Sequence, residues 1–106
     1  MEYISGFEKF SECINCEKYI LLFFTASWCG PCKRIYPQLE ELYKKMDKDI
    51  IKIYKINIDD DENEKMCNIF KVESVPSFFL LKNKECINNI KGADINGIKK
   101  MLNIKD

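Results

Sequence analysis

Residues 19–33 read YILLFFTASWCGPCK and join an apolar segment to a pair of cysteines. Residues 19–24 form a short continuous apolar run, which is typical of a central strand covered on both faces of a sheet. After the cysteines, apolar residues recur at helical spacing as far as Met46. Cys29 therefore lies where a helix begins, and unpaired backbone N–H groups and the helix dipole favour an anion there. A thiolate is such an anion and attacks disulfides, so Cys29 and Cys32 form a candidate redox centre.

The composition is that of one folded domain without a strong overall charge. The chain has 106 residues, of which 46% are hydrophobic, and its 17 basic side chains balance 17 acidic ones. A chain of this length buries roughly two thirds of its unfolded surface, so we predict a single domain over residues 1–106. The balanced charge argues against binding to nucleic acid or to anionic membranes.

The sequence also lacks the patterns that direct a chain into or across a membrane. It contains no run of about 20 apolar residues, as a membrane-spanning helix requires. Its first residues do not show the basic and then apolar order of a secretory signal. Because six cysteines occur without such a signal, we expect reduced thiols, catalysis or metal binding rather than a disulfide scaffold. We therefore expect a cytoplasmic protein.

The other cysteines leave two questions open. Histidine is absent, which excludes Cys-His nucleophilic catalysis and zinc sites that need imidazole. The C-x2-C-x12-C-x2-C spacing resembles a four-cysteine zinc ribbon, but ribbons space their pairs by about 15–20 residues, so we expect no metal. Cys13 and Cys16 share one helix face; packed or free thiols are the favoured interpretation, and a secondary redox or regulatory pair is the alternative. Cys67 and Cys86 are interpreted as small hydrophobic residues rather than as redox sensors.

The pattern along the chain alternates strands with helices. Strands are predicted at residues 3–4, 19–24, 50–58, 77–82 and 85–91. Helices are predicted from a capping box at residues 5–8 to about Cys16, from the cysteine pair to about Met46, after the acidic residues 59–64, and over residues 95–102. Strands separated by helices should be parallel, and the last two, joined at Asn83-Lys84, should form an antiparallel hairpin. The fold class is therefore α/β with a mixed sheet.

Five features of the chain, in this order, closely resemble the thioredoxin family. They are WCGPCK at residues 28–33, Pro37, KINID at residues 55–59, Val75-Pro76 and Gly92-Ala93. The resemblance extends from about Leu21 to Leu102. It implies the thioredoxin fold, in which a sheet with a parallel core and an antiparallel C-terminal hairpin is flanked by helices on both faces.

The resemblance also implies an activity and its partners. The expected activity is that of a thiol–disulfide oxidoreductase, a protein-disulfide reductase that works through a mixed disulfide in electron transport and cell redox homeostasis. The expected substrates are proteins that contain disulfides, and no cofactor is expected. Electrons would come from a flavoprotein thioredoxin reductase or from a glutathione-type donor, and the protein would act as a monomer.

The resemblance also implies a role for each residue of the cysteine turn. Cys29 would attack with an exposed sulfur, and Cys32, one turn further in and shielded, would be the resolving thiol. Gly30 and Pro31 fill the turn, and proline is well placed in a first helical turn because its missing N–H is no loss there. In this family, Gly-Pro between the cysteines accompanies reducing members.

Three further segments are expected to form the substrate surface. Trp28 would lie beside the cysteines and shape that surface. Pro76 would follow a cis peptide bond, and the backbone of Val75 would pair with an extended substrate. Gly92 would form the third wall, where a small residue permits close approach by a partner's backbone.

One position departs from the family's pattern. Most members bury an aspartate six residues before the first cysteine, and this chain has Phe23 there. The aspartate usually helps to move the proton of the resolving cysteine, and its usual partner is present as Lys55. We therefore expect a more stable fold, because burying a carboxylate is costly, and a slower release of the mixed disulfide at neutral pH. In having an aromatic residue at this position, the chain resembles tryparedoxin and nucleoredoxin, so the subfamily stays open.

Two other functions are compatible with parts of the sequence. A disulfide oxidase or isomerase of a secretory compartment uses the same chemistry, but Gly30-Pro31 and the absence of a signal argue against it. A binding module whose dithiol only regulates a partner is the second alternative. Phe23 lends this alternative some weight, because an impaired proton route suits a slow switch.

Overall fold

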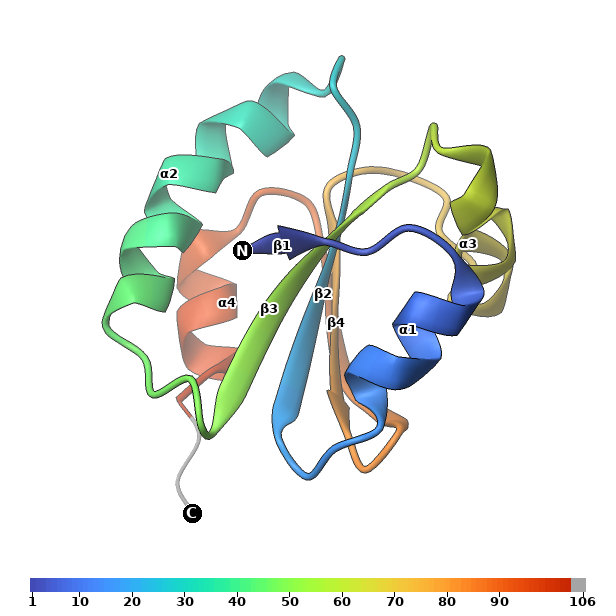
Figure 1. The fold of residues 1–106 in the computed structure, drawn as a ribbon. Coiled ribbons are helices and arrows are strands. Elements are labelled where there is room, and N and C mark those ends of the chain that lie inside the picture. Colours follow the sequence, from blue (N-terminus) through green and yellow to red (C-terminus); the bar gives the residue numbers. More distant parts are fainter. Residues whose placement is uncertain (104–106) are drawn as a thin grey trace.

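A computed structural model describes residues 1–103 as a five-stranded mixed sheet with helices on both faces (Figure 1). The elements are β1 (Glu2–Tyr3), α1 (Phe7–Ile14), β2 (Tyr19–Thr25), α2 (Gly30–Lys44), β3 (Ile51–Asn57), the 3-10 turn η1 (Asp61–Asn63), α3 (Glu64–Ile69), β4 (Ser77–Lys82), β5 (Glu85–Lys91) and α4 (Ile95–Met101). The strand order is β1-β3-β2-β4-β5. The pairs β1–β3 and β2–β3 are parallel, and β2–β4 and β4–β5 are antiparallel, which confirms the predicted sheet.

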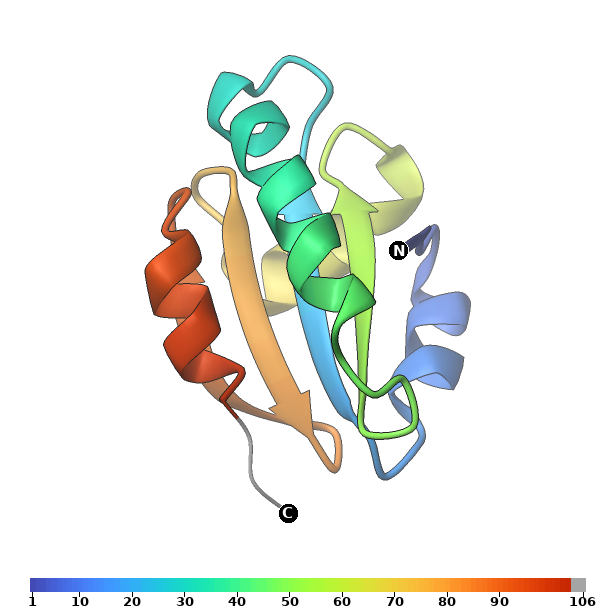
Figure 2. The ribbon, with the colours of Figure 1, turned by 90° about the vertical axis from the view of Figure 1, so that its left-hand side faces the viewer.

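Strand β2 is buried along almost its whole length because both faces of the sheet are covered. Leu21 and Phe23 point into a core that is closed by α2 and α4. Leu22 and Phe24 point into a second core, which α1 and α3 close on the opposite face. Figure 1 shows these two helical layers on either side of the sheet, and Figure 2 shows α2 lying across it with α4 at one side. Alternation along an extended strand thus supplies both cores at once.

The start of α1 differs from the predicted capping box. Gly6 is the N-cap residue, and no side chain caps the helix. The Ser5 hydroxyl instead donates to Asp60 Oδ2 at 2.6 Å, and the Gly6 N–H donates to Asn63 Oδ1 at 2.9 Å. The capping-box interpretation was wrong because tertiary bonds to the segment around η1 take the place of local ones.

Several element ends lie one or two residues from their predicted positions. Helix α1 ends at Ile14, before Cys16, and α2 ends at Lys44, before Met46. The hairpin turn is as predicted, since Asn83 and Lys84 both have positive φ, at 53° and 69°. Two such residues make the turn whose twist matches that of the flanking strands.

The sheet brings four segments together at one end of the molecule. Strands β2 and β3 are parallel, so the turn that begins α2 and the loop after β3 leave the sheet at the same edge. Phe24 pairs with Ser77, and Ser77 pairs with Lys91, so the chain before β4 and the chain after β5 reach that edge as well. Figure 1 shows these connections at the end of the sheet opposite the hairpin turn. This edge contains the candidate site.

Candidate active site

Cys29 and Cys32 are joined by a disulfide at the beginning of α2. Their Cα atoms are 5.2 Å apart. Cys29 is the N-cap residue in an extended conformation, and Pro31 occupies the first turn of the helix. The Cys32 N–H donates to Cys29 Sγ at 3.2 Å. The sulfur of Cys29 therefore lies where a helix N-terminus offers a free N–H donor, as the sequence predicted.

Both sulfurs are covered in this disulfide form. Cys29 and Cys32 are each 3% exposed, and both belong to the core on the α2 face. The expectation that Cys29 presents an exposed sulfur was therefore wrong for this state. The physical reason is the tight approach to the helix, in which the Cys29 N–H donates to the Ala26 carbonyl at 3.1 Å and holds the turn against the core. Gly30 is exposed and Pro31 half-buried on the outside of this turn.

Trp28 stands at the surface beside the cysteine turn. It is 65% exposed, and its Nε1–H donates to Asp59 Oδ2 at 2.7 Å. Asp59 is itself held, because its N–H donates to Asn57 Oδ1 at 3.0 Å. In the sequence Asp59 stands out only as the last residue of the KINID motif, which does not predict this contact. The available signal was that residues following two neighbouring parallel strands meet at the same edge of a sheet.

Val75-Pro76 and Gly92 form one hydrogen-bonded unit. The Val75–Pro76 peptide bond is cis, as the family resemblance implied. The Gly92 N–H donates to the Pro76 carbonyl at 2.8 Å. Gly92 has φ +90°, a left-handed conformation that glycine adopts without steric cost. Val75 packs against the core that contains Cys29 and Cys32, so these two segments adjoin the cysteine turn.

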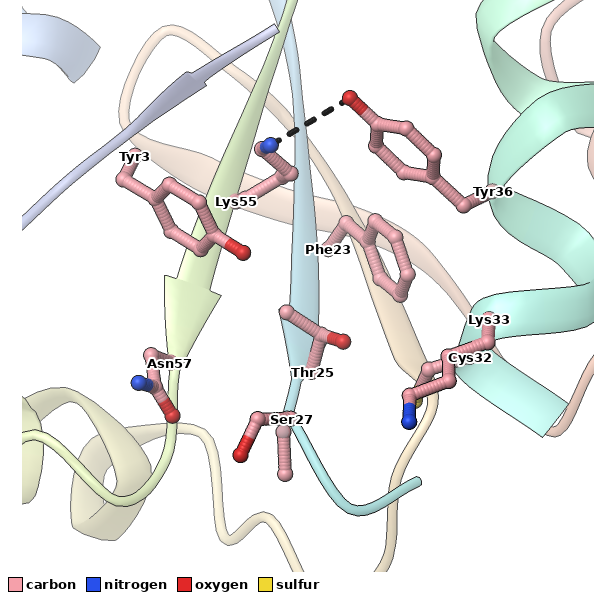
Figure 3. A pocket seen from close by; sticks show the side chains of 10 residues that line it. Tyr3, Phe23, Thr25, Ser27, Cys32, Lys33, Tyr36, Lys55 and Asn57 are labelled. Carbon is pink, nitrogen blue, oxygen red and sulfur yellow. Dashed lines mark hydrogen bonds between the residues drawn. The ribbon is translucent and has the colours of Figure 1, made fainter. Parts of the chain in front are cut away.

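A pocket of about 500 Å³ opens beside Cys32 (Figure 3). It is lined by Tyr3, Phe23, Thr25, Ala26, Ser27, Cys32, Lys33, Tyr36, Lys55 and Asn57. Phe23 is 1% exposed and stacks on Phe78, with ring centroids 4.8 Å apart. The lining contains no carboxylate, so this side of Cys32 has no acid beside it.

Lys55 reaches the same pocket between two tyrosine rings. Its Nζ lies 4.0 Å from the ring centroid of Tyr3 and 4.8 Å from that of Tyr36, and it donates to the Tyr36 hydroxyl at 3.5 Å (Figure 3). Burial lowers the pKa of the Lys55 ammonium, and the more distant Glu40 carboxylate opposes that shift. Burial, followed by Glu40, raises the pKa of Tyr36. In the part of the chain that the structure describes, the one ion pair is Lys44–Glu41, so Lys55 has aromatic faces in place of a carboxylate partner.

The remaining cysteines lie away from this site. Cys13 and Cys16 pack against the core on the α1 face, whereas Cys29 and Cys32 belong to the core on the α2 face. A zinc ribbon would have to unite both pairs, and the sheet separates them. Among residues 1–103, no group of three or more potential metal ligands is placed to hold an ion.

Cys67 and Cys86 have different surroundings. Both are free thiols, and Cys67 is half-buried against the core on the α1 face, as expected. Cys86 is exposed on β5, so its interpretation as a packed small residue was wrong. The reason is that β5 is an edge strand whose residues are almost all exposed.

Over the described residues, no helix combines the length and apolarity needed to cross a membrane.

Proteins similar to this chain in sequence and structure are thioredoxins. The thioredoxin family model matches residues 4–104. A thioredoxin H-type of Fagopyrum esculentum is 40% identical over 86 residues, covering 81% of this chain and 71% of that protein. A thioredoxin of Malassezia sympodialis is 30% identical over 94 residues, covering 89% of this chain and 88% of that protein.

The solved structures extend the similarity to the fold. The Malassezia sympodialis thioredoxin structure has a TM-score of 0.87 at 27% identity and covers 95% of this chain and 86% of that chain. The Plasmodium falciparum thioredoxin structure has a TM-score of 0.85 at 26% identity and covers 95% of each chain. The likeness therefore includes the sheet, its helical layers and the cysteine turn.

Proposed function

The chain belongs to the thioredoxin family and is a protein-disulfide reductase that acts by dithiol–disulfide exchange, and we propose that Cys29 attacks the substrate and Cys32 resolves the intermediate. The observation that carries this assignment is the hydrogen bond from the Cys32 N–H to Cys29 Sγ at the N-terminus of α2. In the reduced protein the same donor and the helix dipole would stabilise a thiolate on Cys29. Residues 1–106 would form a single domain.

The exchange conserves sulfur atoms and electrons. The Cys29 thiolate attacks one sulfur of the substrate disulfide, forms a mixed disulfide, and expels the other substrate sulfur as a thiolate that takes up a proton. Cys32 loses its proton and attacks Cys29 Sγ. The mixed disulfide breaks, the second substrate sulfur leaves as a thiol, and the Cys29–Cys32 disulfide forms. The substrate gains two electrons, which the dithiol has lost.

The substrate would lie against Trp28, the cis Val75-Pro76 segment and Gly92. Support comes from their position at the edge of the sheet that carries the cysteine turn, with Trp28 65% exposed. Gly92 holds the Pro76 carbonyl through its N–H, which leaves the backbone of Val75 as the element that would pair with an extended substrate. Gly30 and Pro31 would shape the rim of the turn.

The proton of Cys32 would leave through the pocket that Phe23 and Lys55 line. No carboxylate lines this pocket, and its volume of about 500 Å³ leaves room for water. Water would carry the proton, and the Lys55 ammonium would favour the thiolate of Cys32 electrostatically. A water route is a weaker acceptor than a positioned base, so the resolving step would be slow at neutral pH.

The electron donor, the compartment and the oligomeric state complete the proposal. Electrons would come from a flavoprotein thioredoxin reductase or from a glutathione-type donor, and protein substrates with disulfides would receive them. A cytoplasmic location accords with four free cysteines among the described residues, because thiols persist in reducing compartments. The protein would act as a monomer in electron transport and redox homeostasis, which leaves Trp28 free for substrates.

Reduction of insulin disulfides tests the assignment. Turnover would be measured in parallel with an NADPH-coupled thioredoxin reductase and with glutathione as donor. Cys29→Ser should abolish turnover with both donors, and Cys32→Ser should accumulate a mixed disulfide on Cys29. Cys86→Ser, at an exposed cysteine away from the site, is the matched control and should retain full turnover. Turnover by Cys29→Ser at the wild-type rate would refute the proposed roles.

A further inference from the structure

A second Cys-x-x-Cys pair lies at the C-terminal end of α1. Cys13 lies in the last turn of the helix, and Cys16 follows its end. Between them, Asn15 has φ −83° and ψ 65°, and the Cys16 N–H donates to the Ile14 carbonyl at 2.9 Å, which makes an inverse γ-turn. After this turn the Cys16 thiol donates to the Cys13 carbonyl oxygen, with Sγ and oxygen 3.7 Å apart.

The two cysteines are neighbours at the end of α1, since Cys16 Sγ is 3.7 Å from the Cys13 carbonyl oxygen. A disulfide between them would need their Cβ atoms at about 3.5–4.5 Å. Residues 15–18 belong to no helix or strand, so the chain can adjust there without breaking a regular element. Both cysteines are free and half-buried.

A pocket of about 280 Å³ lies over these thiols and is lined by basic side chains. Its lining residues are Lys9, Glu12, Cys13, Cys16, Lys18, Lys52 and Tyr54. Three ammonium groups face one carboxylate, so the pocket favours an anionic occupant. Lys9 precedes Cys13 by four residues on the helix, which places them on the same face. The volume is slightly below the range of small-molecule sites, which span about 300–1,000 Å³, so the pocket would hold only part of a small disulfide.

Tyr54 brings a phenol beside Cys13. Burial, followed by the adjoining Cys13 thiol, raises the pKa of Tyr54 to about 12. The phenol therefore keeps its proton at neutral pH and can donate a hydrogen bond to a sulfur atom at Cys13. Of the two thiols, Cys13 is the one that adjoins this phenol.

The active-site disulfide of the same molecule cannot reach this pair. Cys13 and Cys16 lie on the α1 face of the sheet, and Cys29 and Cys32 lie on the α2 face. In Figure 1 the end of α1 that leads into β2 lies at the opposite end of the sheet from the start of α2. Exchange at the second pair therefore needs a diffusible oxidant.

We propose that Cys13 and Cys16 form a second redox site that exchanges with a carboxylate-bearing low-molecular-weight disulfide of the glutathione disulfide type. Cys13 loses its proton and attacks one sulfur of that disulfide, forming a mixed disulfide and releasing one glutathione thiol. Cys16 loses its proton and attacks Cys13 Sγ, which forms the Cys13–Cys16 disulfide and releases the second thiol. Two electrons pass from the protein to the small disulfide. The Cys13–Cys16 pair and its pocket take no part in the chemistry assigned to Cys29.

Peptide mapping by mass spectrometry tests the proposal on the full chain. The reduced protein would be exposed to glutathione disulfide, quenched at early times and analysed at each cysteine. The wild type should form the Cys13–Cys16 disulfide, and Cys16→Ser should accumulate one glutathionyl group on Cys13. Exposed Cys86, outside the pocket, provides an internal reference in every sample. Modification of Cys13 no faster than that of Cys86 would overturn the proposal.

The charge of the probe provides a second and independent readout. Relative to Cys86, Cys13 should react with anionic glutathione disulfide at least about fivefold faster than with cationic cystamine, the factor expected of one ion pair in water. Lys9→Gln and Lys52→Gln should reduce this preference, and Lys99→Gln on α4, outside the pocket, should not. Equal preference in all these variants would contradict an anion-selective site. A rate that scales with protein concentration and vanishes in Cys29→Ser would assign the oxidation to a second copy instead.

Discussion

Phe23 stacks on Phe78 with ring centroids 4.8 Å apart and an interplanar angle of 19°, and Phe23 lines the same pocket as Cys32. A stacked, buried aromatic pair stabilises a core through apolar burial and through the offset of the two rings. Position 23 therefore contributes aromatic packing to the core and offers no proton acceptor. Under the proposed mechanism, a change at this residue should alter both the stability of the fold and the speed of the resolving step.

Phe23→Asp should reverse both effects. It removes a buried ring and places a carboxylate in the core, so the free energy of unfolding should fall by at least about 3 kcal/mol. The resolving step should accelerate about tenfold or more, because a positioned base replaces a water route. Denaturant unfolding and single-turnover release of a mixed disulfide measure the two quantities. Phe23→Leu is the control, since it loses the ring without adding a base, and equal acceleration in that variant would eliminate the proton role.

Asp59→Ala should impair turnover more than stability. The Trp28 Nε1–H donates to Asp59 Oδ2 at 2.7 Å, and Trp28 is 65% exposed, so losing this bond should cost less than about 1 kcal/mol. The freed indole would no longer be held in one orientation, and insulin reduction should slow by about two- to fivefold. Trp28 is the only tryptophan in the chain, so its fluorescence reports the change directly. Asp61→Ala, at an exposed acid nearby, should leave both signals unchanged.

Gly92→Ala should destabilise the fold and also reduce activity. Gly92 has φ +90° with open space where a Cβ would lie, so the cost is backbone strain of about 1–2 kcal/mol. The strained residue would also disturb its hydrogen bond to the Pro76 carbonyl and thereby the proposed substrate surface. Gly6 has φ +91° and the same open space. Gly6→Ala should therefore also lose stability but keep full specific activity. A loss of specific activity in both variants would contradict the role of Gly92 in the substrate surface.

Tyr54 should make the fold sensitive to alkali. Burial, followed by Cys13, raises the pKa of Tyr54 from 10.0 to about 12. Between these values the unfolded chain has lost the phenolic proton and the folded chain retains it, so the folded state binds more protons and its stability falls as the pH rises. Tyr54→Phe should show a smaller loss of unfolding free energy from pH 10 to pH 12 in urea titrations. Parallel curves for the two proteins would contradict a raised pKa.

Local features of the sequence were sufficient for most of the fold. Residues 19–33 contain a buried strand, a cysteine pair and a helix start, because each of these elements is encoded by periodicity and by a helix terminus. Asn83-Lys84 predicted its hairpin because the required positive φ angles belong to the turn itself. Parallel and antiparallel pairing followed from whether a helix or a tight turn joins two strands.

Contacts between segments distant in the chain could not be predicted in the same way. Ser5 was expected to cap α1, and it bonds Asp60 instead, 55 positions away. Nothing in the local sequence of Trp28 points to Asp59, because the contact arises where two parallel strands end side by side. The exposed sulfur expected of Cys29 is covered in the disulfide form, since the packing of the whole turn against the core decides its exposure.

The sequence by itself determined the redox chemistry, because a helix start and two cysteines three positions apart are local properties of the chain. Only the tertiary structure decided how the six cysteines divide. Helix α1 packs on one face of the sheet and α2 on the other, so the pair at the end of α1 joins one core and the pair at the start of α2 joins the other. Side chains on one face of the sheet do not contact those on the other. The two Cys-x-x-Cys pairs therefore have different surroundings although their spacing is the same.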